Sequence, residues 1–87
     1  MSRTVLLSTP AQHDYEGLPS DVRRRLRSAL LTFATTGRGN LKKLKGVGKG
    51  TDLYRLRVGD FRVVFAMNLK EIQVTRIIPR SEGYDWL

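Results

Sequence analysis

The pair Gly59-Asp60 constrains the fold more than any other feature of this sequence, because it separates two stretches in which apolar residues recur at alternate positions, 53–58 and 61–67. A glycine-containing pair between two such stretches predicts a tight turn that joins two antiparallel strands. A two-residue turn places Val58 opposite Phe61, and residues that lie opposite each other share one face of a sheet. The face predicted to be apolar consists of Tyr54, Leu56, Val58, Phe61, Val63 and Phe65.

The other face of the predicted hairpin is basic. It carries Arg55, Arg57 and Arg62, and the same register places Arg57 directly opposite Arg62. Like charges that lie opposite one another destabilise a sheet, so stability alone does not explain this arrangement. We interpret the three arginines as a preformed binding site for an anion. The alternative interpretation is a solvated surface on which the aliphatic parts of the side chains cover apolar residues.

An amphipathic helix is predicted to cover the apolar face of the hairpin. It begins at Ser20 and ends near Thr35, and Gly37 is a typical residue directly after a helix. Apolar residues recur along one side of this helix at helical spacing, and they are Val22, Leu26, Ala29, Leu30 and Phe33. The other sides carry basic residues, which we interpret as a solvated surface rather than a phosphate-binding one. These are Arg23, Arg24, Arg25 and Arg27.

The remaining segments complete a two-layered α+β fold. Residues 3–8 are predicted to form a first strand, and a short helix follows that Thr9 is expected to cap. Residues 37–52 are rich in glycine and lysine, and we predict a loop there. Residues 72–79 are predicted to form the last strand. The short turns between the last three strands favour an antiparallel meander with both helices on one face, in the order β-α-α-β-β-β.

The register of the last strand stays open at this stage. A turn centred on residues 69–70 places Ile72, Val74 and Ile78 on the core face, but it places Arg76 there as well. A β-bulge or a different register would move Arg76 away from the core.

The charge of the chain indicates the class of its partner. There are 16 lysines and arginines against 8 acidic residues, which gives a formal net charge of +8. On so short a chain this indicates a polyanion, most commonly nucleic acid; an anionic membrane surface or an acidic protein would also satisfy it. Cysteine is absent and His13 is the only histidine. We therefore expect no disulfide, no metal site and no other cofactor.

No stretch of the sequence is long and apolar enough for a signal peptide or a membrane span. We therefore expect a cytoplasmic protein without a membrane partner. Its length allows one hydrophobic core, so we expect a single domain over residues 1–87.

Three stretches of the sequence together resemble a known family of toxins. They are Leu44-Lys45-Gly46, the hairpin 53–65 with its run Tyr-Arg-Leu-Arg-Val-Gly-Asp-Phe-Arg-Val-Val-Phe, and the C-terminal Pro79-Arg80-Ser81-Glu82-Gly83-Tyr84. This combination is similar to the RelE/ParE superfamily, and within it to the RelE-type, archaeal-like toxins of toxin–antitoxin systems. The likeness extends from Leu41 onward, whereas the N-terminal half agrees only in layout and in its basic helices.

The resemblance implies a ribosome-dependent endoribonuclease that enters the ribosomal A site, cleaves mRNA there without a metal ion and inhibits translation. It also implies a cognate antitoxin protein that wraps and blocks the toxin, and a toxin–antitoxin complex that binds operator DNA. ParE-type relatives share the fold but poison DNA gyrase instead. Two further alternatives are a non-catalytic module that binds RNA and a module whose basic face binds only an acidic protein.

The resemblance also assigns catalytic roles to particular residues. Arg62 matches an arginine placed at the scissile phosphate, and Arg80 matches a C-terminal basic residue. Tyr84 matches a tyrosine that orients the base or the nucleophile. Arg55 belongs to a basic pair that contacts RNA, and it completes the predicted catalytic set. The sequence departs from some members of the family at Ile78, where they carry an arginine six residues before the tyrosine.

The predicted RNA-binding residues outside the catalytic set are also basic. Arg57 is the second member of the RNA-contacting pair. Some family members carry lysine at the positions of Arg55 and Arg57. The basic segment that precedes the hairpin adds Lys43, Lys45 and Lys49. The combined set of Arg55, Arg62, Arg80 and Tyr84 favours the RelE-type interpretation over the ParE-type one.

The chemistry of RNA cleavage leaves the general base open. Attack by the neighbouring 2′-hydroxyl requires loss of its proton, stabilisation of charge on the phosphate and protonation of the 5′-oxygen. Arginine stays protonated, so it is a poor base but a strong phosphate clamp. His13 has no histidine partner. The candidates for the base are Tyr84, Lys45, Lys49 and a group supplied by the ribosome. A site without a good base predicts slow cleavage of free RNA.

Overall fold

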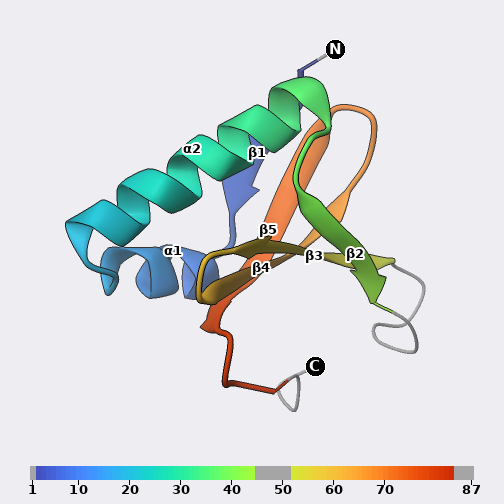
Figure 1. The fold of residues 1–87 in the computed structure, drawn as a ribbon. Helices are drawn as coiled ribbons and strands as arrows, with labels where there is room; N and C mark the ends of the chain where they lie inside the picture. The colour runs from blue at the N-terminus through green and yellow to red at the C-terminus, as the bar shows by residue number, and fades with distance from the viewer. Residues whose placement is uncertain (1, 45–51, 84–87) are drawn as a thin grey trace.

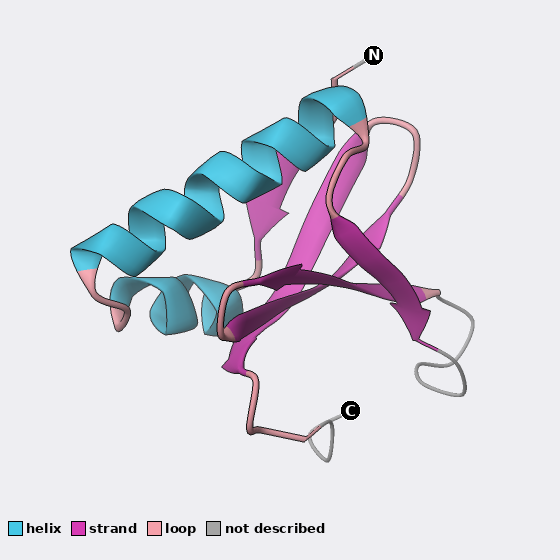
Figure 2. Cartoon of the chain, viewed as in Figure 1, coloured by secondary structure: helices cyan, strands magenta, loops and turns pink. Residues whose placement is uncertain are grey.

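The structure is a computed structural model that describes residues 2–44 and 52–83 of the chain. Its elements are β1 (Thr4–Leu7), α1 (Thr9–Glu16), α2 (Ser20–Thr36), β2 (Asn40–Leu44), β3 (Leu53–Val58), β4 (Phe61–Met67) and β5 (Glu71–Pro79). The strands form one sheet in the order β1-β5-β4-β3-β2, and the helices form a second layer against it (Figure 1; Figure 2). The predicted two-layered α+β fold is confirmed.

The predicted meander of β3, β4 and β5 is present, but the sheet around it is larger and mixed. β1 joins in parallel to β5, with Val5 opposite Ile72. Residues 40–44, which we predicted to be part of a loop, form β2 along the outer edge of β3, with Leu41 opposite Leu56. The loop prediction was wrong there because the segment shows little apolar alternation. It forms a strand because its main-chain groups pair with the open edge of β3.

The β3–β4 hairpin has the predicted register. Val58 lies opposite Phe61, and Arg57 lies opposite Arg62. Gly59 adopts a φ of 57°, and no non-glycine residue in the described ranges has a positive φ. A two-residue turn with a positive φ only at its first position has the type II′ pattern, which favours glycine there.

Helix α2 supplies the main apolar surface over the sheet. Leu26, Leu30, Phe33 and Ala34 are its buried residues. The helix ends as predicted, because Gly37 adopts a left-handed φ of 76° and its N–H donates to the carbonyl of Phe33. In the core, the ring of Phe65 lies 5.6 Å from that of Phe33 and 5.8 Å from that of Tyr54, centroid to centroid. This aromatic group joins the helix layer to the centre of the sheet.

Helix α1 begins one residue earlier than the capping prediction placed it. The cap is Ser8 rather than Thr9, because the Ser8 hydroxyl accepts a hydrogen bond from the N–H of Ala11. The same hydroxyl donates to the carbonyl of Thr75 at 2.8 Å. Ala11 is fully buried in the core. Helix α1 is therefore tied to β5 just beyond the point where β1 ends.

A β-bulge in the β4–β5 pair settles the position of Arg76. Val64 lies opposite Arg76, but the next residue of β4, Phe65, lies opposite Val74, so β5 carries one extra residue at this point. Val74 consequently keeps its place in the core, and Arg76 is moved off the core face. This is the outcome that the sequence left open. The expectation for Ile78 was wrong, because the extra residue places Ile77 in the main core and Ile78 on the opposite face of the sheet.

Arg76 is held by an acidic residue of α1. Its Nε donates to Oδ2 of Asp14 at 2.7 Å and its Nη2 donates to Oδ1 at 3.2 Å, which makes a two-point ion pair. The hydrogen bonds and charge of Asp14 raise the pKa of the Arg76 guanidinium, and the charge of Glu82 adds to this effect. Oδ2 of Asp14 also accepts the main-chain N–H of Ile77 at 3.0 Å. Helix α1 thus satisfies the part of the β5 edge that β1 is too short to reach.

Candidate functional site

The face of the sheet opposite the helices carries the predicted arginines in adjacent register positions. Arg57 of β3 and Arg62 of β4 lie opposite each other, and Arg55 is the next residue of β3 on the same face. Strand β2 adds Lys42, which lies opposite Arg55. Because four cations then share one face of three neighbouring strands, the arrangement favours a polyanion that runs across them.

A hollow of about 520 Å³ lies where this face meets the end of β5. It is lined by Asp60, Phe61, Arg62, Pro79, Arg80 and Ser81. The main-chain N–H of Arg80 donates to the carbonyl of Asp60 at 2.7 Å, so the segment after β5 is tied to the β3–β4 turn. This bond brings two predicted catalytic residues, Arg62 and Arg80, to one hollow although they lie on different segments.

The predicted catalytic residue Arg55 and its neighbour Arg57 lie outside the lining of this hollow. Arg55 is partly buried and Arg57 is exposed. Neither forms an ion pair with another residue in the described ranges, where the ion pairs are Lys43 with Asp52 and Arg76 with Asp14. The guanidinium groups of Arg55 and Arg57 are therefore available to an anionic ligand.

Ile78 lies opposite Arg62, so it occupies a position beside the predicted scissile-phosphate arginine. It is fully buried, and together with Leu53 and Val64 it forms a small apolar cluster on the basic face. Some family members carry an arginine at this position. In this chain the residue at this position is apolar and packs in the sheet, so it adds no positive charge beside Arg62. Among the described residues, the two cations that line the hollow are Arg62 and Arg80.

Lys43 is not brought together with the arginines. It lies opposite Tyr54, a residue of the helix-side face, and its Nζ forms an ion pair with Asp52 at 3.2 Å. The predicted residues Lys45, Lys49 and Tyr84 lie outside the described residues. The part of the site that the structure describes is therefore built from arginines.

Three residues near the predicted site were missed by the sequence analysis. Lys42 was assigned to a loop. Asp60 was treated only as a turn residue, yet it lines the hollow. Arg25 was counted with the solvated side of its helix, but its guanidinium approaches the turn so closely that a Cβ on Gly59 would lie 3.2 Å from its Nη1. The side of α2 on which Arg25 lies was visible in the sequence, but the placement of that side beside the turn was not.

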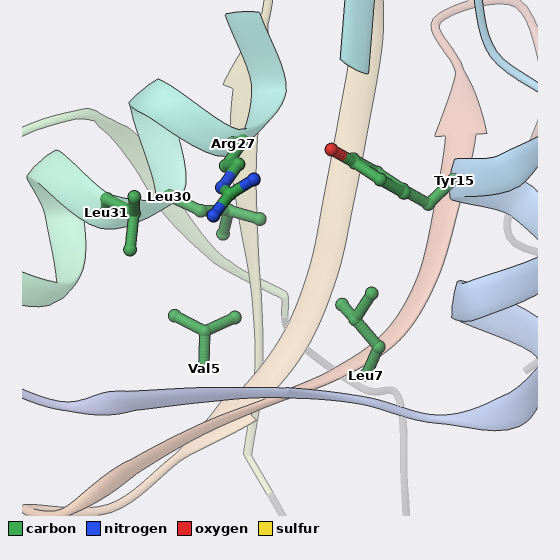
Figure 3. A pocket seen from close by; sticks show the side chains of 6 residues that line it. All are labelled: Val5, Leu7, Tyr15, Arg27, Leu30 and Leu31. Carbon is green, nitrogen blue, oxygen red and sulfur yellow. The ribbon is translucent and has the colours of Figure 1, made fainter. Parts of the chain in front are cut away.

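A second, apolar pocket of about 300 Å³ opens between α2, β1 and α1, and no pattern in the sequence predicted it. Figure 3 shows the side chains that converge on it, which are Val5, Leu7, Tyr15, Arg27, Leu30 and Leu31. Leu31 is 52% exposed at its margin. Arg27 is the one charged residue among the described residues of this lining. In the ranges 2–44 and 52–83, no residue lines both this pocket and the hollow that contains Arg62.

Neither a membrane-spanning helix nor a cluster of metal ligands is found in the part of the chain that the structure describes. None of its helices is long and apolar enough to cross a membrane. No group of three or more histidine, cysteine or acidic side chains in these ranges is placed to bind a metal ion.

Solved structures with the same fold include complexes of a toxin with an antitoxin. The archaeal RelE-RelB complex from Pyrococcus horikoshii OT3 matches with 27% identity and a TM-score of 0.76, over 95% of this chain and 100% of that chain. The RelB-RelE antitoxin-toxin complex from Methanococcus jannaschii matches at 23% identity, with a TM-score of 0.72, over 94% of this chain and 98% of that one. The YoeB dimer from Staphylococcus aureus matches at 18% identity, also with a TM-score of 0.72, over 97% of this chain and 100% of that chain.

A search of curated protein sequences finds no significant match. A family model matches residues 5–84, and its description is "ParE toxin of type II toxin-antitoxin system, parDE". This match covers the helices, the sheet and the hollow. The chain has a RelE-like fold, and it belongs to the ParE toxin family of type II toxin–antitoxin systems.

Proposed function

We propose that this toxin is a ribosome-dependent endoribonuclease that cleaves mRNA in the ribosomal A site without a metal ion. The observation that carries the proposal is the hollow in which Arg62 and Arg80 meet beside the basic face of the sheet. A strand of RNA that crosses this face presents one phosphate to the hollow, while neighbouring phosphates lie against the exposed arginines.

The chemistry of the site fits transition-state stabilisation. When the 2′-oxygen attacks phosphorus, negative charge grows on the phosphate oxygens, and two fixed guanidinium groups stabilise that charge. Arginine is suited to this because its planar group offers two parallel hydrogen bonds to a phosphate. Much of the remaining rate enhancement comes from holding the 2′-oxygen in line with the bond that breaks. The ribosome supplies that positioning in this proposal.

A second candidate function is favoured by a specific observation. The family model that matches the chain is that of ParE toxins. A likeness to ParE-type toxins implies action on DNA gyrase. The burial of Ile78 beside Arg62 also removes one cation that some RNA-cleaving members carry. Against this, Arg80 places a second guanidinium in the hollow, which a gyrase-binding surface does not require.

The two functions are separated by inducing the protein in cells and following three responses together. These are the rate of protein synthesis, the integrity of individual mRNAs and the induction of the DNA damage response. We expect protein synthesis to fall and mRNAs to be cut within translated codons. A DNA damage response with intact mRNA would support the gyrase-directed function instead, and no response in any assay would leave a non-catalytic binding module.

We further propose that a cognate antitoxin inhibits this toxin through an acidic amphipathic segment that covers the apolar pocket between α2 and β1. Three of the similar solved structures are toxin–antitoxin complexes, which supports such a partner. The pocket offers an apolar floor, with Leu31 partly exposed and Arg27 at its margin. On a chain of net charge +8, a segment with one apolar face and acidic flanks is complementary in both respects.

A further inference from the structure

Among the residues that the structure describes, Asp60 is the one acidic residue in the lining of the hollow that contains Arg62 and Arg80. Its side chain is exposed and forms no ion pair with another residue in the ranges 2–44 and 52–83. A carboxylate here weakens phosphate binding, because it places a negative charge beside the bound anion. The described arginines of this face stay protonated and are poor bases, whereas an aspartate carboxylate can accept a proton.

We propose that Asp60 is the general base that takes the proton from the attacking 2′-hydroxyl, an inference that rests on the proposed RNA cleavage. In this step the 2′-oxygen forms a bond to phosphorus while the bond from phosphorus to the 5′-oxygen breaks. The 2′ proton passes to the Asp60 carboxylate, and a water molecule protonates the 5′-oxygen. The hydroxide that remains takes the proton from Asp60, so the products are a 2′,3′-cyclic phosphate and a 5′-hydroxyl.

The main-chain hydrogen bond at Asp60 allows its side chain to be changed without loss of the local structure. Arg80 is tied to Asp60 through the main-chain carbonyl, so a change of side chain leaves that bond in place. Gly59 provides the positive φ of the turn, and asparagine is as well suited as aspartate to the neighbouring turn position. Asp60→Asn therefore removes the proton acceptor and keeps the turn, its size and its link to Arg80.

The test is single-turnover cleavage of a defined mRNA on programmed ribosomes, with binding measured on the same complexes. Asp60→Asn is expected to lower the cleavage rate about 10²–10⁴-fold, the usual contribution of a general base. Binding is expected to be equal or tighter, because a negative charge has left the hollow. Asp60→Glu keeps the carboxylate and is expected to retain part of the rate. Asp21→Asn, the same change at an exposed position in the first turn of α2, is the matched control and is expected to cleave at the wild-type rate.

A second substrate identifies which proton Asp60 moves. An mRNA with sulfur in place of the bridging 5′-oxygen has a leaving group that needs no proton. If Asp60 acts on the 2′-hydroxyl, Asp60→Asn stays slow on this substrate. Full recovery with sulfur would place Asp60 at the leaving group and overturn the assignment.

The remaining outcomes are also decisive. Cleavage by Asp60→Asn at the wild-type rate, or loss of ribosome binding together with cleavage, would overturn the role of Asp60 and leave the proposed function standing. A wild-type protein that cuts no mRNA on ribosomes would overturn the proposed function, and the role of Asp60 with it.

Discussion

Arg57 and Arg62 face each other across two strands, although the repulsion between them opposes the pairing of those strands. An anion placed between them relieves this repulsion, so the protein gains stability when a phosphate binds. In the proposed reaction, these guanidinium groups would already be in position before the attack begins. Charge that develops on the phosphate would then be stabilised without further movement of the protein.

Removal of Arg62 is therefore expected to affect cleavage more than binding. Arg62→Ala should lower the single-turnover rate of mRNA cleavage about 10²–10³-fold, the usual loss for one such donor, and bind ribosomes nearly as well as wild type. Arg62→Lys should recover the rate only in part, because lysine keeps the charge and loses the two-point geometry. Wild-type cleavage by Arg62→Ala would show that the hollow is not the active site.

Arg25 is expected to contact a phosphate beside the hollow, because its guanidinium lies against the turn that carries Asp60. Arg25→Ala should weaken RNA binding and reduce the slope of log affinity against log salt concentration by about 0.7, the value for one phosphate contact with a single strand. Arg24→Ala removes an exposed arginine from the neighbouring position of the same helix and should leave the slope unchanged. Equal slopes for the two variants would show that Arg25 contacts no phosphate and belongs to the solvated side of the helix.

These residues also mark how far the sequence could predict the site. Alternation along one hairpin was enough to place Arg57 opposite Arg62, because the distance between them depends only on a two-residue turn. Nothing in the local pattern could place Arg80 or Arg25 near that turn. Arg80 reaches it through a main-chain bond to Asp60, and Arg25 reaches it through the packing of α2 on the sheet. Both depend on contacts between segments far apart in the chain.

At the level of elements, α2 and the hairpin form one core whose stability depends on complementary packing. Leu26 is fully buried on α2, whereas Leu31 of the same helix is 52% exposed. Leu26→Ala should lower the free energy of unfolding by about 2–5 kcal/mol, because it removes buried surface and leaves a cavity. Leu31→Ala, the same chemical change at an exposed position, should cost less than about 1 kcal/mol. Equal losses in denaturant unfolding would contradict the packing of α2 on the sheet.

The features that the sequence did not predict lie in the outer parts of the sheet, where pairing with an open strand edge or contact with a helix determines the structure. β2 has no clear alternation, and its identity as a strand depends on the open edge of β3. The bulge beside Phe65 moves Arg76 to Asp14, and the gain from that ion pair depends on where α1 lies. Local periodicity therefore predicted α2 and the central hairpin well, while the outer parts of the sheet follow from tertiary contacts.

For the whole molecule, the apolar pocket and the basic hollow share none of their described lining residues, so the proposed antitoxin binding and the proposed cleavage are expected to be separable by mutation. Arg27→Glu reverses the charge at the pocket and should weaken binding of the acidic antitoxin at least about tenfold, with mRNA cleavage retained. Arg24→Glu makes the same change in net charge at an exposed position of the same helix and should have a smaller effect. Titration of both variants with the purified antitoxin measures this difference. Equal affinities would place the antitoxin elsewhere on the toxin.

The parallel pairing of β1 with β5 joins the first strand of the chain to the last one. A nascent chain emerges from its N-terminus, so β1 is exposed long before β5 leaves the ribosome. The hollow depends on the same late segment, because Pro79, Arg80 and Ser81 form half of its lining. The hollow is therefore assembled only after residues 79–81 have left the ribosomal exit tunnel, late in the synthesis of the described residues.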